Sequence, residues 1–128
     1  MGRIRGDLKE RTFEFAVAIV NLVRLLPNDT RGWEVARQLF RSGTSIGANV
    51  READNAFTDA DFAYRCSVAR KEAGETHYWL QLCERTGLLS GDPLQQAITE
   101  ADELARILSS IVRALQQRSE SPDASRTE

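Results

Sequence analysis

The chain has 128 residues, of which 41% are hydrophobic and 28% charged, and its formal net charge is −2. This length favours one domain with a single core, and the near-neutral charge excludes a strong overall attraction to nucleic acid or to a membrane surface. The longest apolar run, residues 15–20, is far shorter than the roughly 20 residues that cross a bilayer. We therefore expect a cytoplasmic protein with no membrane partner.

The first predicted helix covers residues 7–26 and is apolar around more than half of its circumference. Asp7 and Glu10 have the spacing of a capping box, and Pro27 is predicted to end the helix. Only a narrow polar side is left, at Glu10, Glu14 and Asn21. A helix this apolar is either central to the fold or covered by a second chain.

The second predicted helix covers residues 31–55 and contains two glycines, Gly43 and Gly47, four residues apart. Because glycine weakens a helix interior by roughly 1 kcal/mol, this pair indicates that another backbone comes close to the helix. The face predicted to point into the core consists of Trp33, Ala36, Leu39, Phe40, Gly43, Ile46, Gly47, Val50 and Ala53.

The third predicted helix begins at a second capping box, formed by Thr58 and Asp61, and ends at Thr86. Gly87 fits the left-handed residue that commonly terminates a helix. Its apolar residues follow the alternating four-three spacing of a bundle seam.

The fourth predicted helix begins at Asp92 and Pro93 and runs to about residue 117, with the same four-three spacing. Four long amphipathic helices joined by short connections predict an all-α fold, an antiparallel up-down-up-down four-helix bundle. The bundle domain is predicted to span residues 1–117, followed by a disordered tail over residues 118–128, which is rich in Ser, Glu and Asp.

Surplus apolar groups on the first and third helices predict that copies of this chain associate into a homo-oligomer. A polar row at helical spacing on the second helix is predicted to hydrogen-bond between helices or between subunits. The candidate interface residues are Tyr64, Val68, Tyr78, Trp79 and Leu82, and the polar row is Ser45, Asn49 and Glu52.

The sequence offers no catalytic constellation, so we assign no catalytic, cofactor-binding or metal-binding residue and expect a protein that is not an enzyme. A di-metal bundle site needs two Glu-x-x-His motifs, whereas this chain has one histidine, His77, preceded three residues earlier by Gly74. Cys66 and Cys83 would lie roughly 25 Å apart along one helix, too far for a disulfide. A bundle metalloenzyme remains the least favoured alternative.

Residues 42–54 also allow a DNA-binding interpretation. Ser42 to Ser45 would form the turn of a helix-turn-helix, and Ile46 to Asp54 would be its recognition helix. Against this, Asn49 occupies a position that normally holds an apolar residue, and Arg51 is the only basic residue of that helix. This alternative requires a sharp turn near Gly43.

Several basic residues are candidates for contacts with RNA or DNA, although a solvated face of mixed charge is the simpler interpretation. A symmetric oligomer would repeat a modest basic patch, and its weak phosphate contacts would add. The candidates are Arg37, Arg41, Arg65, Arg70 and Lys71.

Two sequence blocks carry a family resemblance. Residues 42–53 (Ser-Gly-Thr-Ser-Ile-Gly-Ala-Asn, then Arg-Glu-Ala) and residues 61–80 (Asp-Phe, Ala-Arg-Lys-Glu-Ala, Glu-Thr, Tyr-Trp-Leu) resemble the four-helix-bundle proteins named after 23S ribosomal RNA intervening sequences, over about residues 13–115. Relatives include the accessory variability proteins of diversity-generating retroelements, which form pentameric barrels that bind nucleic acid and reverse transcriptase. The resemblance implies a homopentamer with a nucleic-acid role, although those relatives are strongly basic and this chain is slightly acidic.

The sequence therefore favours a non-enzymatic oligomeric scaffold that acts on RNA, DNA or a protein partner through its assembled surface.

Overall fold

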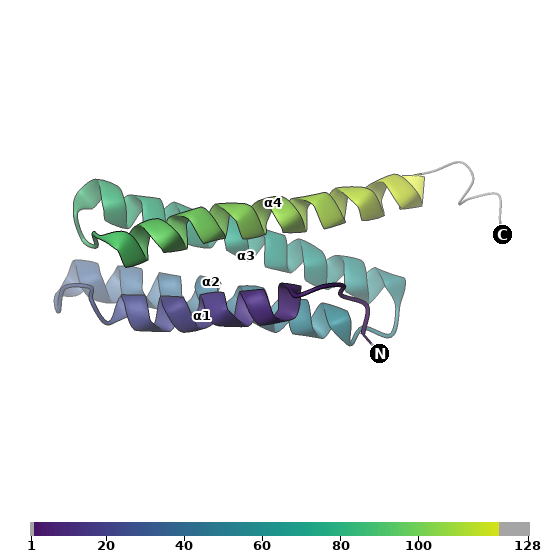
Figure 1. Cartoon of the computed structure of the whole chain (residues 1–128), viewed down its shortest axis with the longest axis horizontal. Coiled ribbons are helices and arrows are strands. Elements are labelled where there is room, and N and C mark those ends of the chain that lie inside the picture. Colours follow the sequence, from purple (N-terminus) through teal and green to yellow (C-terminus); the bar gives the residue numbers. More distant parts are fainter. Residues whose placement is uncertain (1, 121–128) are drawn as a thin grey trace.

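The computed structural model describes residues 2–120, which form four α-helices and no strand. Their bounds are Leu8–Val23 for α1, Thr30–Asp54 for α2, Asp59–Thr86 for α3 and Asp92–Glu120 for α4. Each helix packs against the next one along the chain, and α4 closes the bundle against α1. Consecutive helices run in opposite directions along the long axis (Figure 1). The predicted all-α four-helix bundle is confirmed.

The ends of α1 differ from the prediction. The Asp7 side chain makes no capping hydrogen bond, and the helix ends at Val23 rather than at Leu26. The chain then turns, with the amides of Leu25 and Leu26 bonded to the carbonyls of Leu22 and Val23 at 3.0 and 3.2 Å. The α-helix therefore ends a few residues before Pro27, because these two bonds span three residues and form a tighter turn than an α-helix.

The start of α3 and the glycine after it agree with the sequence analysis. The Thr58 hydroxyl accepts a hydrogen bond from the amide of Asp61 at 3.0 Å, which satisfies one of the free amides at the helix start. Gly87 has a φ of 76° and closes α3 in the left-handed conformation.

The C-terminal helix is longer than predicted. α4 continues to Glu120, three residues beyond the boundary expected at residue 117, because nothing in Arg118 to Glu120 interrupts helical geometry. The predicted tail beyond it, residues 121–128, lies outside the described residues.

The glycine pair of α2 lies where α1 comes closest. A Cβ added at Gly47 would lie 3.2 Å from the backbone oxygen of Thr12, and one added at Gly43 would lie 2.9 Å from two side-chain carbons of Ile19. Both glycines are buried. The expectation that a neighbouring backbone approaches α2 here is confirmed for Gly47, whereas Gly43 accommodates a side chain.

Two residues expected in the core are not there. Trp33 and Phe40 are 58% and 49% exposed, while Leu39, Ile46 and Val50 of the same predicted face are buried. Trp33 and Phe40 lie seven residues apart at the edge of the buried face of α2. There α1 covers the glycines of α2 but leaves these two side chains exposed. Helical spacing alone does not give the rotation of α2 about its axis, so it could not separate these edge positions from the core.

The helix-turn-helix alternative is wrong. α2 is continuous from Thr30 to Asp54, so Ser42 to Ser45 form no turn, and residues 46–54 are not a separate recognition helix. Gly43 is tolerated inside the helix because its missing side chain makes room for Ile19.

Candidate functional site

The seam between α2 and α3 is held by one arginine and two carboxylates. Arg41 of α2 donates to Glu72 at 3.1 Å and also pairs with Glu75, and Trp79 donates its indole N–H to Glu75 at 3.2 Å. The Arg41 guanidinium holds the pKa of Glu75 below its usual value and has a raised pKa itself, chiefly through its hydrogen bond to Glu75. Arg41 is therefore a structural ion-pair partner with little free charge for a phosphate.

Beneath this ion pair, two hydroxyls join the helices in the core. The side-chain oxygens of Ser42 and Thr76 are hydrogen-bonded at 2.9 Å, and both residues are fully buried. Thr76 also donates to the carbonyl oxygen of Glu72 at 2.8 Å. Because a buried hydroxyl without a partner is costly, this contact fixes how α2 and α3 face each other.

The predicted polar row lies along the same seam. The Asn49 amide donates to the carbonyl of Ser45 at 2.9 Å, and its oxygen accepts from Arg65 of α3 at 3.3 Å. The Ser45 hydroxyl bonds to the carbonyl of Arg41 in its own helix, and Glu52 is exposed. Within the described residues, Asn49 is the only member of this row that hydrogen-bonds to another helix.

The five basic candidates separate into three groups. Arg41 and Arg65 are engaged in the seam, the latter also 3.7 Å from Asp61. Arg37 faces Glu34 one turn earlier on the exposed side of α2. The remaining two, Arg70 and Lys71, are exposed on α3, and neither forms an ion pair among residues 2–120.

The predicted interface residues on α3 do not share one exposed face. Tyr64 and Tyr78 are 60% and 58% exposed, whereas Val68, Trp79 and Leu82 are half-buried. Trp79 packs against the core and against the edge of Tyr78, with ring centroids 5.1 Å apart. The two tyrosines therefore remain interface candidates, and the other three also serve the packing of their own subunit.

A second apolar surface lies on the outer side of α1 and α2. The sequence analysis expected surplus apolar groups on the first helix but named no residues there, and it assigned Trp33 and Phe40 of α2 to the core. The spacing of this surface on α1, every three or four residues, was the signal available in the sequence. Arg51 of α2 lies over the ring of Phe13 of α1 at 5.1 Å, which shows that the two helices contribute to one surface. This ridge consists of the exposed side chains of Phe13, Val17, Val20, Trp33 and Phe40.

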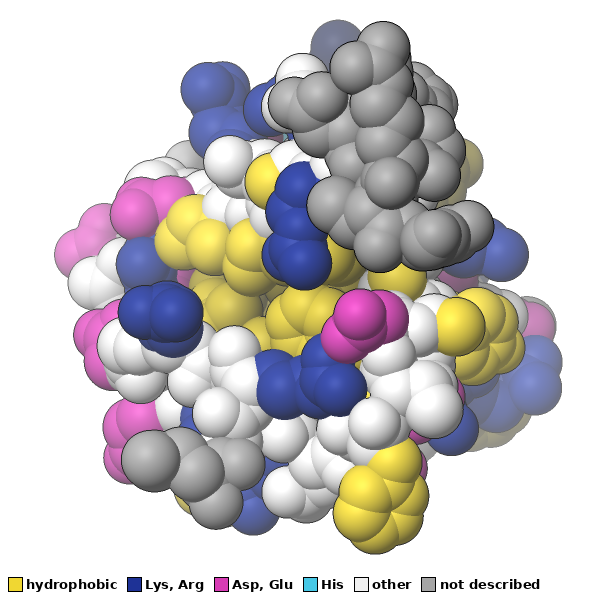
Figure 2. Space-filling view, turned by 90° about the vertical axis from the view of Figure 1, so that its right-hand side faces the viewer, with side chains coloured by type: hydrophobic (Ala, Val, Ile, Leu, Met, Phe, Trp, Pro, Cys, Tyr) yellow, Lys and Arg dark blue, Asp and Glu magenta, His cyan; other side chains and the backbone are white. Residues whose placement is uncertain are grey.

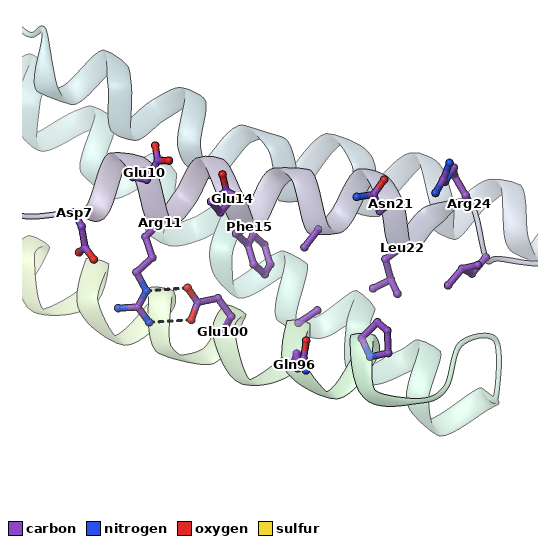
Figure 3. A pocket seen from close by; sticks show the side chains of 14 residues that line it. Asp7, Glu10, Arg11, Glu14, Phe15, Asn21, Leu22, Arg24, Gln96 and Glu100 are labelled. Atoms are coloured by element: carbon purple, nitrogen blue, oxygen red, sulfur yellow. Dashed lines mark hydrogen bonds and ion pairs between the residues drawn. The ribbon is translucent and has the colours of Figure 1, made fainter.

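On its other side, α1 borders a groove. α1 and α4 pack less closely than the other neighbouring helices, and a cavity of about 590 Å³ lies between them. Phe15 and Leu22 point from α1 toward α4 (Figure 3). Arg11 crosses the groove and pairs with Glu100 at 2.8 Å. The groove has an apolar floor and charged edges.

The end of the bundle that contains the described N-terminal residues is fastened by one buried carboxylate. Asp54 is only 6% exposed; it accepts from the amide of Ile4 at 2.6 Å and pairs with Lys9 at 2.8 Å. These bonds, led by the one from Lys9, lower the pKa of Asp54. Arg3 pairs with Asp59 at 2.8 Å nearby.

Basic side chains surround an apolar centre on this end face (Figure 2). Arg5 and Arg118 are exposed there, the latter close enough to Asp59 to lower its pKa slightly, after the larger effect of Arg3. We define the end face by Arg3, Arg5, Lys9 and Arg118.

Residues 2–120 contain no group of three or more His, Cys, Asp or Glu side chains that could hold a metal ion. Cys66 and Cys83 are both buried and unpaired with each other, and burial raises the pKa of each thiol to about 11. Among the same residues, no helix is long and apolar enough to cross a membrane.

Comparisons with known proteins agree with the fold. The family model of the 23S rRNA-intervening sequence proteins matches residues 7–110. A crystal structure of a protein of unknown function from the S23 ribosomal protein family of Bacteroides thetaiotaomicron is similar, with 42% sequence identity and a TM-score of 0.75. The match covers 82% of this chain and 97% of that one. A comparison with curated proteins gives no match.

Proposed function

The chain belongs to the 23S rRNA-intervening sequence protein family, and on this basis we propose that it is a non-enzymatic scaffold that works as a homo-oligomer. Its assembled surface would engage RNA, DNA or a protein partner. By resemblance, the assembly is a pentamer.

The observation that carries this proposal is the ridge on α1 and α2. Five large apolar side chains are each more than a third exposed there, and three of them, Phe13, Val17 and Val20, follow one another along α1. A soluble monomer rarely exposes this many large apolar side chains on two adjacent helices, whereas a subunit interface buries them. Burial of Phe40 and Phe13 by a second copy would remove their remaining apolar area from water, at about 25 cal/mol per Å².

The test is a measurement of mass in solution by light scattering after size exclusion. Phe40→Ser removes an exposed ring from the ridge without opening the core, so the mass should fall. Phe57→Ser is the matched control, because Phe57 is 98% exposed in the turn between α2 and α3 and lies outside the ridge. A wild-type protein with the mass of one protomer at every concentration would reject the proposal.

The tyrosines of α3 provide a separate arm of this experiment. Replacing Tyr64 and Tyr78 together by Ser tests the interface predicted from the sequence. A loss of mass in this variant, with Phe40→Ser unchanged, would move the interface from the ridge to α3.

A second candidate function is binding to the phosphate backbone of RNA or DNA, which the end face favours. Arg5 and Arg118 are exposed, basic side chains gather on this end of the bundle (Figure 2), and an oligomer would repeat them. Each phosphate contact releases counterions, so the affinity should fall steeply as salt is added.

For this candidate, Arg5→Ala with Arg118→Ala should weaken RNA binding and flatten its salt dependence. Arg70→Ala with Lys71→Ala is the competing pair, equal in charge and located on α3, because the sequence also made these two residues candidates; a loss of binding confined to this pair would move the contact from the end face to α3. Binding that is independent of salt, or absent at low salt, would reject the nucleic-acid role and leave the scaffold proposal in place.

A further inference from the structure

The groove between α1 and α4 is lined on α1 by apolar residues at the spacing of a helix seam. Phe15 and Leu22 form its floor and are buried by their own subunit, whereas Ala18 and Leu25 are exposed along it. On α1, Phe15, Ala18, Leu22 and Leu25 line it at intervals of three and four residues, as in the contact rows of packed helices. The groove extends along α1 from Asp7 to Leu25, which corresponds to about 27 Å of helix. It can therefore accept a convex, helical, apolar surface of similar length.

The charge of the groove limits what fits into it. Four carboxylates and only two guanidiniums line it, and one of these, Arg11, is already paired with Glu100 and with Glu103 at 2.9 Å. An occupant with basic residues beside its apolar groups is therefore favoured. The four carboxylates belong to Asp7, Glu10, Glu14 and Glu100.

The ridge on α1 and α2 has these properties. It is helical and apolar, and the exposed Arg51 of α2 is stacked over Phe13 within it. Arg37 is also exposed on α2, where it pairs with Glu34. The ridge and the groove occupy different sides of α1, so one copy can offer both at once. Two facing grooves, by contrast, would bring like charges together.

We propose that the α1–α4 groove of one protomer receives the α1–α2 ridge of a second copy of this chain. The contact is then heterologous: each copy gives a ridge to one neighbour and a groove to another. Such a contact closes into a ring or extends into a filament, and it does not stop at a two-fold dimer. This inference rests on the proposed homo-oligomer and adds which two surfaces meet.

Two variants at exposed positions disable one surface each. Ala18→Arg fills the groove, and Phe40→Glu places a carboxylate on the ridge, opposite the acidic groove; both positions are exposed. Helix content measured by circular dichroism establishes that each variant is folded. Each variant alone should sediment at the mass of one protomer, 14.3 kDa.

The decisive step is to mix the two variants. The Ala18→Arg protein keeps its ridge and the Phe40→Glu protein keeps its groove, so the mixture should form species of two protomers and nothing larger. Sedimentation velocity over a concentration series measures this. Phe57→Glu, located outside both surfaces, should keep the wild-type mass.

The outcomes separate the two proposals. A monomeric wild-type protein removes both of them. A wild-type oligomer whose mass is unchanged by Ala18→Arg agrees with the oligomeric scaffold but overturns the groove contact. The same result is expected if another protein, and not a second copy of this chain, occupies the groove. A mixture that stays monomeric while each variant is folded overturns the ridge-to-groove contact, because the intact ridge of one variant and the intact groove of the other would then fail to associate.

Discussion

Replacing Gly43 by Ala should not stabilise the protein. The same replacement usually does stabilise a protein when the glycine lies in an open helix interior. Alanine in place of glycine in a helix interior contributes about 1 kcal/mol. At Gly43, however, the new Cβ would lie 2.9 Å from both γ carbons of Ile19. Carbon atoms prefer roughly 3.5 to 4.0 Å, so about 0.6 Å of separation is missing.

Ile19 has little freedom to move away. It is fully buried, and its β-branched side chain is held near one χ1 rotamer in a helix. Overpacking of this kind costs about 1 to 3 kcal/mol. The net effect of Gly43→Ala should therefore lie between no change and a loss of about 2 kcal/mol, by the sum of the two terms.

Gly74 provides the matched control, because it is an exposed glycine inside α3 with no atom within 4 Å of an added Cβ. Gly74→Ala should raise the free energy of unfolding by about 1 kcal/mol, or the melting temperature by about 4 °C. Urea unfolding followed at 222 nm, at one fixed protomer concentration, measures both variants.

The contact itself can be isolated with a double-mutant cycle. Ile19→Ala removes both γ carbons and should relieve the cost of Gly43→Ala by roughly 0.5 to 3 kcal/mol, whereas Ile19→Val keeps both and should relieve little. If Gly43→Ala stabilises the protein as much as Gly74→Ala does, the close approach of α1 and α2 is not what selects glycine at this position.

Three further predictions concern titratable groups and a helix cap. Because the pKa of Asp54 is lowered, its contribution to stability is complete above the unfolded-state pKa near 3.9 and is lost as the pH falls through the folded-state pKa. Asp54→Asn should therefore lower the free energy of unfolding by roughly 1.5 to 3 kcal/mol at pH 7. In unfolding curves recorded at acid pH, the difference between the variant and the wild type should shrink. Cys66 and Cys83, whose thiol pKa values are about 11, should react with a thiol reagent at pH 8 much more slowly in the native protein than in denaturant, and equal rates would contradict their burial. Thr58→Ala should lower the free energy of unfolding by about 1 kcal/mol. Thr58→Ser keeps a capping hydroxyl and should lower it much less.

The local signals of the sequence predicted the helices well because they act within a few residues. The Thr58 cap and Gly87 are found where the sequence placed them. Asp7 was misjudged because a capping box depends on the backbone conformation of the cap residue, and here that conformation is not extended. Tertiary constraints on the chain before α1 override the pattern.

The candidate site was harder to predict than the fold. The sequence offered Arg41 as one of five basic candidates, but only the packing of α2 on α3 shows that it faces Glu72 and Glu75. The α2 part of the ridge was missed because an apolar residue in a helix has the same periodicity whether it faces the core or a second chain. Trp33 and Phe40 were assigned to the core for this reason.

By itself, the sequence determined that this chain forms four amphipathic helices, where most of them begin and end, and that α2 has to admit a close neighbour at Gly47. Each of these features depends on helical periodicity or on the conformational preference of one residue. The tertiary structure decided which side chains remain exposed, which charges neutralise one another, and that α1 borders a groove on one side and a ridge on the other. Those properties depend on how far apart the helices lie and how each is rotated about its axis, and both are set by the fit of all four helices together.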